Sequence, residues 1–460
     1  MNRSAMKDLV SWKDSLSRKP LLFQGARQVG KTWLLKEFGR QNFENTAYVN
    51  FDRNEMLRHI FDGDYSVKRI LTALQLACGK PIVPGKTLLI LDEIQEAPRA
   101  VGCLKYFCEE APQYHIAAAG SYLGVASLEK TSFPVGKVNT LVLHPLSYLE
   151  FLEAMGQERF AQLLRSHDWQ TIALFKDTLI EYLRYYYVVG GMPEAVEAFS
   201  QRRDFGQVRA LQRELLRNYE NDFGKHTPGE IIPGIRMIWD SVPVQLAKEN
   251  KKFFLSQVQK KARKTDFSEA IEWLCNAGFL YRVRRISKPS LPLSAYVEED
   301  IFKLFFLDVG LLGAQANLDP RVLLEGNRIF TEFKGALTEQ YVQQQLLAET
   351  DFLPFYWAGP SNEVDFVFQY GTGVMPLEVK AETNLRARSL MCFCRKNRIP
   401  MAVRSSMIDY RVDWTDTIPS VPMDGEEFKF LLANLPLYAL ASLPAVCEEL
   451  ARRADKGQGG

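Results

Sequence analysis

The stretch that most constrains this chain is residues 21–35, which read LLFQGARQVGKTWLL. An apolar run typical of a buried strand leads into the pattern G-x-x-x-x-G-K-T, and a helical pattern begins at Trp33. Backbone N–H groups of such a loop can surround phosphate oxygens, because its glycines allow close approach and the helix N-terminus adds partial positive charge. The stretch therefore predicts a phosphate-binding loop, or P-loop, between a strand and a helix.

Each position of this loop is expected to bind ATP or its Mg²⁺. Lys31 would reach the β- and γ-phosphates, and the Thr32 hydroxyl would ligate the metal ion. The other residues expected to contact the nucleotide are Gly25, Ala26, Arg27, Gln28, Val29, Gly30 and Trp33.

A second apolar run ends in two carboxylates. Residues 87–95 read TLLILDEIQ, so the run enters directly into Asp92 and Glu93, as expected for a parallel strand buried on both faces. On its own this pattern is weak, but a P-loop upstream makes it specific. Asp92 would hold Mg²⁺ together with Thr32, and Glu93 would orient and deprotonate the attacking water.

Five runs occur in an order that resembles one family. They are GARQVGKT, LDEIQ, AAGSYLG, LHPLSYLEFL and VVGGMPEAV. Together they resemble a large prokaryotic family of AAA-type ATPases, similar to the archaeal and STAND branches of P-loop proteins, with a C-terminal half similar to restriction endonucleases. The resemblance implies a helical lid in which Gly191-Met192-Pro193 forms a G-x-P element and Pro193 packs against the base. Gly190 and Gly191 also suit an ordinary helix-ending turn.

Two further features of the nucleotide site have alternatives. Ser121 ends the apolar run of residues 115–121, where related ATPases place a polar residue near the γ-phosphate, but a serine there equally suits a helix N-cap. Neither Arg27 nor Arg99 stands out as an arginine finger, a group that contributes about 10³–10⁵ in rate. A neighbouring subunit would then supply it, which makes the protein a candidate homo-oligomer.

The middle of the chain predicts a winged helix that contacts DNA. Proline–glycine pairs near residues 227–234 mark a break, and three helical patterns precede strands at 279–286 and 302–306. Its basic residues suit binding to a nucleic-acid backbone, although a solvated helix face or a docking surface explains them equally well. They are Lys251, Lys252, Lys260, Lys261, Arg263, Lys264, Arg282, Arg284, Arg285 and Lys288.

The C-terminal part resembles the PD-(D/E)xK nuclease core. Glu339 lies in a helical run, Asp365 in an expected strand, and Glu378 and Lys380 in the next strand. Because side chains alternate along a strand, Glu378 and Lys380 share a face, which Asp365 can join across the hairpin.

This arrangement predicts a Mg²⁺ site. Asp365, Glu378 and the Val379 carbonyl would hold the ion, and Lys380 would position and help deprotonate a water for attack on phosphorus. Glu339 would support a second metal ion or its waters. The alternative is an inactive relic that only binds DNA. Arg386 and Arg388 would touch phosphate or begin a solvated helix, and residues 428–453 are predicted to be helical.

The fold class is therefore α/β in three domains. We expect a P-loop core with a helical lid at residues 1–225, a winged helix at 226–325 and an endonuclease-like α/β domain at 326–460. The seven cysteines are irregularly spaced, no run of apolar residues is long enough to span a membrane, and no secretory signal is visible. These features predict a cytoplasmic protein without a membrane partner.

Three functions fit this organisation. The first is ATP hydrolysis whose nucleotide state controls a DNA-directed, metal-dependent nuclease-like domain. The second is a STAND-like switch in which ATP sets a conformation and the C-terminal domain recognises a partner without cutting. The third is a chaperone-like protein-interaction ATPase. The set Glu339, Asp365, Glu378 and Lys380 distinguishes the first function from the others.

Overall fold

The chain contains two compact units in the computed structural model. The structure describes residues 2–52, 55–121, 133–224, 227, 229–248, 251–259, 264–325, 331–360, 362–381, 388–415 and 428–457. Unit 1 comprises Met1–Pro145, Asp222–Gly229 and Ile271–Phe279, and unit 2 comprises Leu146–Asn221, Glu230–Ala270 and Leu280–Gly460. The predicted boundaries at 225/226 and 325/326 both lie inside a unit, so the three-domain division stays a prediction.

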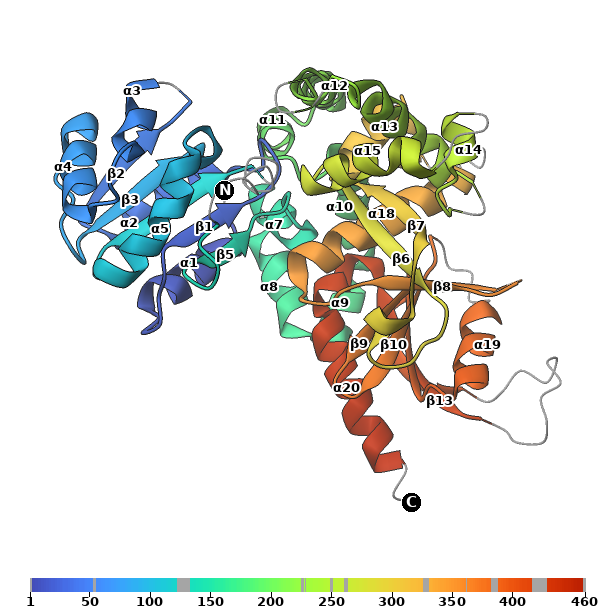
Figure 1. Cartoon of the computed structure of the whole chain (residues 1–460). Helices are drawn as coiled ribbons and strands as arrows, with labels where there is room; N and C mark the ends of the chain where they lie inside the picture. Colours follow the sequence, from blue (N-terminus) through green and yellow to red (C-terminus); the bar gives the residue numbers. More distant parts are fainter. Residues whose placement is uncertain are drawn as a thin grey trace. The chain divides into compact units, whose positions relative to one another are not determined.

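Unit 1 is built on a five-stranded sheet of order β2-β3-β4-β1-β5, in which every pair is parallel (Figure 1). The strands are β1 (Leu21–Gln24), β2 (Asn45–Asn50), β3 (Thr87–Asp92), β4 (His115–Gly120) and β5 (Asn139–Val142). The helices are α1 (Ala5–Asp14), α2 (Lys31–Asn42), α3 (Glu55–Arg58), α4 (Val67–Cys78) and α5 (Pro98–Glu110), with short 3-10 turns at His59–Phe61 and Ile94–Glu96.

Helices cover both faces of this sheet. Leu89 and Leu91 of β3 join the core that contains α4 and α5, while Leu88, on the other face, lies beside Gly39 of α2. β3 and β4 are buried at every position. Their unbroken apolar runs are thus explained by a parallel sheet between two helical layers.

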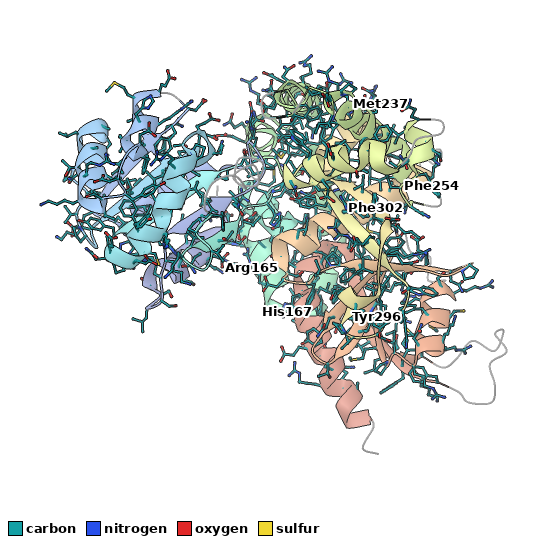
Figure 2. The ribbon with its side chains drawn as sticks, in the orientation of Figure 1. Arg165, His167, Met237, Phe254, Tyr296 and Phe302 are labelled. Atoms are coloured by element: carbon teal, nitrogen blue, oxygen red, sulfur yellow. The ribbon has the colours of Figure 1, made fainter. Side chains whose placement is uncertain are left out.

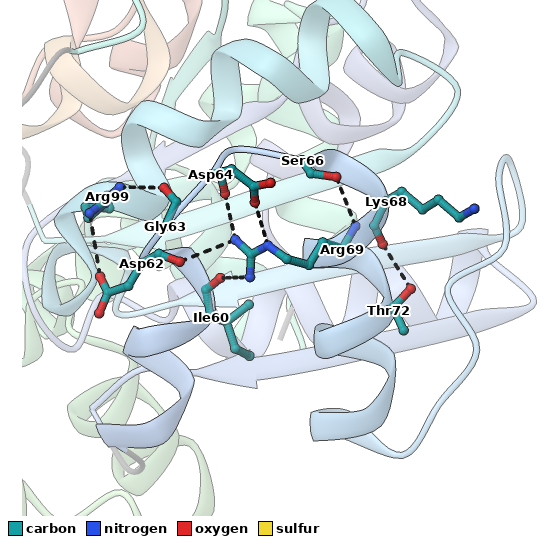
Figure 3. Close-up of polar contacts among 9 residues, drawn as sticks. All are labelled: Ile60, Asp62, Gly63, Asp64, Ser66, Lys68, Arg69, Thr72 and Arg99. Carbon is teal, nitrogen blue, oxygen red and sulfur yellow. Dashed lines mark hydrogen bonds and ion pairs between the residues drawn. The ribbon is translucent and has the colours of Figure 1, made fainter.

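The loop that enters α4 is held by Arg69 (Figure 3). Its guanidinium pairs with the Asp64 carboxylate, Nε to Oδ1 at 2.7 Å, and donates to the backbone oxygens of Ile60, Asp62 and Asp64. Arg99 of α5 donates to Gly63 O at 2.9 Å and lies over the Tyr65 ring. Arg99, one of the two arginines considered as an arginine finger, therefore helps to hold the loop that enters α4.

Unit 2 begins with a run of helices. They are α7 (Tyr148–Ala154), α8 (Glu158–Ser166), α9 (Trp169–Leu174), α10 (Lys176–Val189), α11 (Pro193–Arg202), α12 (Phe205–Asp222), α13 (Ile232–Leu246) and α14 (Leu255–Val258). Helix α15 (Lys264–Asn276) begins in unit 2 and belongs to unit 1 from Ile271 on. Later helices are α16 (Val309–Gln315), α17 (Pro320–Glu325), α18 (Thr331–Glu349), α19 (Arg388–Asn397) and α20 (Leu443–Gly457), with 3-10 turns at Leu293–Tyr296 and Leu437–Ser442. None of the described helices is long and apolar enough to cross a membrane.

An eight-stranded sheet of order β12-β13-β11-β10-β9-β8-β6-β7 completes unit 2 (Figure 1). Its strands are β6 (Leu280–Ile286), β7 (Val297–Phe306), β8 (Phe355–Ala358), β9 (Glu363–Tyr370), β10 (Gly373–Val379), β11 (Met401–Ser406), β12 (Arg411–Thr415) and β13 (Phe430–Pro436). The β6–β7 hairpin, expected as the wing of a separate winged helix, joins this sheet because Arg285 and Ile286 pair in parallel with Tyr356 and Trp357. A separate winged-helix domain is therefore not confirmed.

The prediction of helix throughout residues 428–453 is wrong in its first part. Residues 430–436 form strand β13, which lies between β11 and β12 and is buried at every position. A short apolar run that is buried on all sides gives no periodicity to distinguish a strand from a helix. Only the later part, from Leu443, is α-helical.

Two adjacent glycines of unit 2 lie where a Cβ atom would clash with neighbouring groups. Gly190 ends α10 with φ of 72°, and a Cβ there would lie 2.0 Å from Asp308 Oδ1. A Cβ on Gly191 would lie 2.1 Å from Leu146 O, and Gly191 N donates to Asp308 Oδ2 at 2.6 Å. The buried Asp308 carboxylate also accepts from Gln344 and caps α16. Gly190 and Gly191 are therefore glycines because a larger residue at either position would clash with Asp308 or Leu146.

Replacing Gly190 by Ala is expected to destabilise unit 2 by about 2–4 kcal/mol, because strain at positive φ adds to a clash with a buried carboxylate. Gly156→Ala is the matched control, since Gly156 has φ of 75° but a Cβ there would meet no described heavy atom within 4 Å. That variant should lose only about 1 kcal/mol. Urea unfolding of both variants measures the difference, and equal losses would contradict the role assigned to Asp308.

Candidate active sites

The P-loop lies where the sequence predicts it, between β1 and α2. Gly30 adopts φ of 97° and is the N-cap of α2, so the helix begins at Lys31. A Cβ on Gly25 would lie 2.4 Å from Leu143 O, which explains glycine at that position. Ala26 and Val29 are buried, and Gln28 is exposed with φ of 64°.

Lys31 lies back on its own loop. Its Nζ donates to Gly25 O at 2.9 Å and to Ala26 O at 2.7 Å. Burial lowers the pKa of Lys31 to about 8, although the carboxylates of Glu93 and Asp92 oppose that shift. In the protein without nucleotide, its ammonium group is therefore more easily deprotonated than that of an exposed lysine.

ATP affinity is expected to fall above pH 8. Lys31 must be charged to bind phosphate, and a bound triphosphate would keep it charged, so binding takes up a proton once the free ammonium begins to titrate. With a pKa of about 8 in the free protein, affinity should fall about tenfold per pH unit above that value. Titration with a fluorescent ATP analogue, from about one pH unit below this pKa to about two above it, measures the change. Lys31→Arg should give a flat profile, and a flat wild-type profile would contradict the prediction.

Asp92, the first of the two strand-end carboxylates, contacts the P-loop. Thr32 Oγ1 donates to Asp92 Oδ2 at 2.9 Å, and Tyr48 OH donates to the same oxygen at 2.8 Å. A hydroxyl beside a carboxylate offers the hard oxygen ligands that Mg²⁺ prefers. The residues present thus fit the ion expected from the sequence.

Glu93 has the backbone geometry of a special position. Its φ is 52°, which is uncommon for a residue other than glycine, and its N–H donates to Asp92 Oδ1 at 3.2 Å. The side chain of Gln95 donates to Glu93 Oε2. Glu93 is therefore held next to Asp92 by its own turn and by a neighbouring amide.

Two arginines support the loop in ways that the sequence does not reveal. Arg3 is buried and bridges the loop to the chain after β5, donating to Val29 O at 2.9 Å and to His144 O at 2.5 Å. Arg27 forms an ion pair with Asp222. Arg3 lies far from the loop in sequence, and no motif surrounds it.

The remaining predicted nucleotide contacts lie as follows. Trp33 is 49% exposed on the first turn of α2, and Ser121 is buried directly after β4. Pro193 is the first residue of α11 in unit 2. The roles of all three in nucleotide binding stay predictions.

The acidic residues of the C-terminal part gather in unit 2. Asp365 lies on β9 and Glu378 on the antiparallel neighbour β10, in which Leu377 pairs with Phe366. Continuing that register places Asp365 and Glu378 opposite each other on one face. Asp365 Oδ2 accepts from Val379 N at 2.7 Å, which joins the two strand ends.

Lysines hold most of these carboxylates. Lys380 Nζ lies 2.5 Å from Glu378 Oε1. Glu339 of α18 pairs through Oε1 with Lys251 and through Oε2 with Lys303, whose Nζ is 3.3 Å away. Lys303 also lies 2.5 Å from Glu363 Oε1.

The electrostatics of the site differ from group to group. Burial raises the pKa of Asp365, and the neighbouring Glu339 and Glu378 raise it further. Burial also raises the pKa of Glu378, partly offset by Lys380. Burial opposes the ionisation of Glu339, but Lys251 and Lys303 outweigh it and lower the pKa to about 2. Glu339 is thus the carboxylate that its neighbours keep charged.

One buried atom of this site lacks a partner. Among the residues that the structure describes, Glu378 Oε2 accepts no hydrogen bond although Glu378 is only 4% exposed. A buried carboxylate oxygen without a donor is costly, and a cation would satisfy it. Within the described ranges, however, no three His, Cys, Asp or Glu side chains are placed together to hold a metal ion. A cation at this atom would have Asp365 and Glu378 as its carboxylate ligands and would need backbone or water oxygens for the rest.

Sequence reasoning missed Lys251 as a member of this site, and missed Lys303 and Glu363 altogether. Lys303 is a single charge in the apolar run IFKLFF of β7, a signal that could have marked it as buried and paired. Glu363 lies two positions before Asp365 and so on the same face of β9. For Lys251, the chain beside it is fixed because Phe253 N donates to Phe302 O at 2.8 Å.

The expected DNA-binding surface is partly neutralised within the protein. Arg285 pairs with both oxygens of Glu298 at 2.5 and 2.9 Å, and Arg284 pairs with Glu299 at 2.9 Å. Figure 2 labels Phe302 and Tyr296 on this part of the hairpin and Phe254 beside it. Arg388 begins α19. Lys260, Lys261, Arg263 and Arg386 lie outside the described residues.

Comparison with known families supports the first of these sites. Residues 17–152 match a family described as an AAA domain. This part of the chain is an AAA-type P-loop domain. Residues 180–322 and 334–422 match two domains of unknown function, DUF8612 and DUF4143. The AAA-type part of the resemblance is confirmed, and the nuclease-like part is not.

Three solved structures that are similar to the chain share little of its sequence. The Walker-type ATPase PABY2304 of Pyrococcus abyssi is 14% identical, with a TM-score of 0.44 over 68% of this chain and 95% of that chain. The ORC1 protein of Aeropyrum pernix in complex with DNA is 13% identical, with a TM-score of 0.29 over 70% and 94%. The RuvB Holliday junction branch migration motor of Thermotoga maritima is 14% identical, with a TM-score of 0.29 over 62% and 90%. At these identities and TM-scores, the similarity does not indicate what this chain binds. The comparison with curated protein sequences found no match.

Proposed function

We propose that the protein hydrolyses ATP and that its nucleotide state controls metal-dependent cleavage of nucleic acid by unit 2. The observation that carries the first part is the hydrogen bond from Thr32 to Asp92, which joins the P-loop to the strand end that bears Glu93. The AAA-domain match over the same residues supports it. The second part rests on Asp365, Glu378 and Lys380 sharing one face of the unit 2 sheet.

The chain's own groups suit each step of hydrolysis. The loop backbone and Lys31 would bind the phosphates, while Thr32 and Asp92 would hold the Mg²⁺ that neutralises phosphate charge. Glu93 would accept a proton from the attacking water, and Gln95 would keep its carboxylate oriented. Apart from that of Gln95, these roles are the ones expected from the sequence.

The acidic site supplies the groups for attack on phosphorus. Asp365 and Glu378 would hold a Mg²⁺ ion that polarises the scissile phosphate. Lys380, which lies 2.5 Å from Glu378, would position the attacking water and stabilise negative charge as it develops. The basic residues near α14 and on the β6–β7 hairpin would bring the nucleic-acid backbone to this face.

One observation favours a second function, the ATP-driven switch whose nuclease-like domain does not cut. Glu339 and Glu363 are neutralised by lysines within the fold, and so is one oxygen of Glu378. Such pairing stabilises a site without any metal ion. In that case unit 2 would recognise a partner, and the ATP site would set its conformation.

An assay of both activities on one preparation separates the two functions. The full chain is incubated with ATP and with labelled DNA or RNA, in Mg²⁺ or in Mn²⁺, and phosphate release and strand cleavage are followed together. ATP turnover with cleavage supports the first function. Turnover without cleavage under any of these conditions leaves the switch, and no turnover at all removes both.

A further inference from the structure

The acidic site of unit 2 contains a fully buried lysine, Lys303. Lys303 is 0% exposed, its ammonium group pairs with Glu339 and Glu363, and it lies 4.9 Å from the centre of the Tyr356 ring. An unpaired ammonium in such a position would lose its hydration without compensation, so Lys303 can be buried only because its carboxylate partners are present. Lys303 is therefore a permanent positive charge of the site.

Both carboxylate oxygens of Glu339 are paired with lysine ammonium groups. Its Oε2 faces Lys303 and its Oε1 pairs with Lys251, which is only slightly exposed. The sequence suggested that Glu339 would support a second metal ion or its waters. In the structure two lysine ammonium groups occupy both oxygens instead.

The charges of the site disfavour a second divalent ion. Four carboxylates lie with three ammonium groups and with the guanidinium of the buried Arg404, which pairs in register with Glu378. The carboxylates are Glu339, Glu363, Asp365 and Glu378, and the ammonium groups are those of Lys251, Lys303 and Lys380. These charges balance when all are ionised, so one divalent ion leaves two positive charges in excess, and a second ion would leave four in a largely buried place.

We propose that the ammonium groups of Lys303 and Lys251 take the place of a second metal ion, so that this site binds one divalent cation through Asp365 and Glu378. The inference rests on the proposed metal-dependent function and defines its stoichiometry. Glu378 Oε2, buried and without a partner among the described residues, is the atom left open for that cation. Lys251 and Lys303 are positioning residues, because they act through Glu339 and Glu363.

Counting bound Mn²⁺ tests the proposal without relying on activity. The full chain carrying Asp92→Asn is titrated with Mn²⁺ in the absence of nucleotide, so that the P-loop contributes no ion, and binding is followed by calorimetry and by the Mn²⁺ electron spin resonance signal. One ion per chain is expected, and adding Asp365→Asn should abolish it. Two ions, no ion, or binding that survives Asp365→Asn would overturn the proposal.

Lys251→Met tests the positioning role. It is preferred to a change at Lys303, whose removal would leave two buried carboxylates unpaired and could unfold the protein. Freeing Glu339 Oε1 should raise the stoichiometry from one ion to two, and Lys251→Met with Glu339→Gln should restore one. A stoichiometry that stays at one in Lys251→Met would overturn the role given to Lys251.

The same experiment distinguishes this inference from the proposed function. One bound ion without any strand cleavage would remove the nuclease activity and leave the inference standing. Cleavage with two bound ions would support the activity and remove the inference.

Discussion

Replacing Glu93 by Gln is expected to leave ATP bound and to lower its hydrolysis by about 10²–10⁴-fold, the usual contribution of a general base. The substitution keeps the size of the side chain and a hydrogen-bonding oxygen for Gln95, but it removes the group that accepts the proton. The bond between Thr32 and Asp92 is untouched, so nucleotide and Mg²⁺ should still bind. Phosphate release under multiple turnover, with bound nucleotide measured after gel filtration, shows both effects.

Glu96→Gln is the matched control for this change. Glu96 lies on the same turn, and its carboxylate pairs with Arg58, Oε2 to Nη2 at 3.6 Å. The control should hydrolyse ATP at close to the wild-type rate. If Glu93→Gln also turns over at that rate, another group is the base, and Glu93 then serves only its own strained turn.

The nucleotide site could be predicted because its main residues lie together in two short stretches of sequence. Gly30 and Lys31 lie in one loop whose geometry their own residue types impose. Asp92 and Glu93 end a strand whose unbroken apolar run shows where it is buried. Only the neighbours that the fold brings from elsewhere, such as Arg3 and Tyr48, were beyond the sequence.

Only part of the acidic site could be predicted from the sequence. Asp365 and Glu378 lie on strands joined by a short turn, so their pairing follows from local sequence. Lys303 reaches them because β6 pairs in parallel with β8, and parallel pairing joins segments that no local signal connects. The same long-range pairing makes the β6–β7 hairpin part of this sheet.

Strand β13 shows a different limit. It is buried at every position with β11 and β12 on either side, and its residues Phe430–Pro436 are apolar except for the buried Asn434. Alternation of polar and apolar residues, the usual sign of a strand, is therefore absent. The helix expected there continued the pattern of α20, which begins only at Leu443.

Replacing Asp365 by Asn is expected to abolish metal-dependent strand cleavage, by about 10²-fold or more, while ATP turnover stays within about twofold of wild type. The fold should survive, because an Asn oxygen can still accept from Val379 N and burial already raises the pKa of this carboxyl. Lys380→Ala should have the same effect on cleavage, since it removes the group that positions the attacking water. Cleavage of labelled DNA and release of phosphate from ATP are measured on the same samples.

Asp413→Asn is the control for this pair of variants, because Asp413 is an exposed residue of β12 whose carboxylate pairs only with Arg411 among the contacts described, at 2.8 Å. It should cleave and hydrolyse as wild type does. If the Asp365 and Lys380 variants cut as well as this control, the observed cleavage arises elsewhere, and unit 2 would be a recognition domain. If they lose ATP turnover as well, the acidic site is required for the hydrolytic state of unit 1, and the two activities cannot be assigned to separate sites.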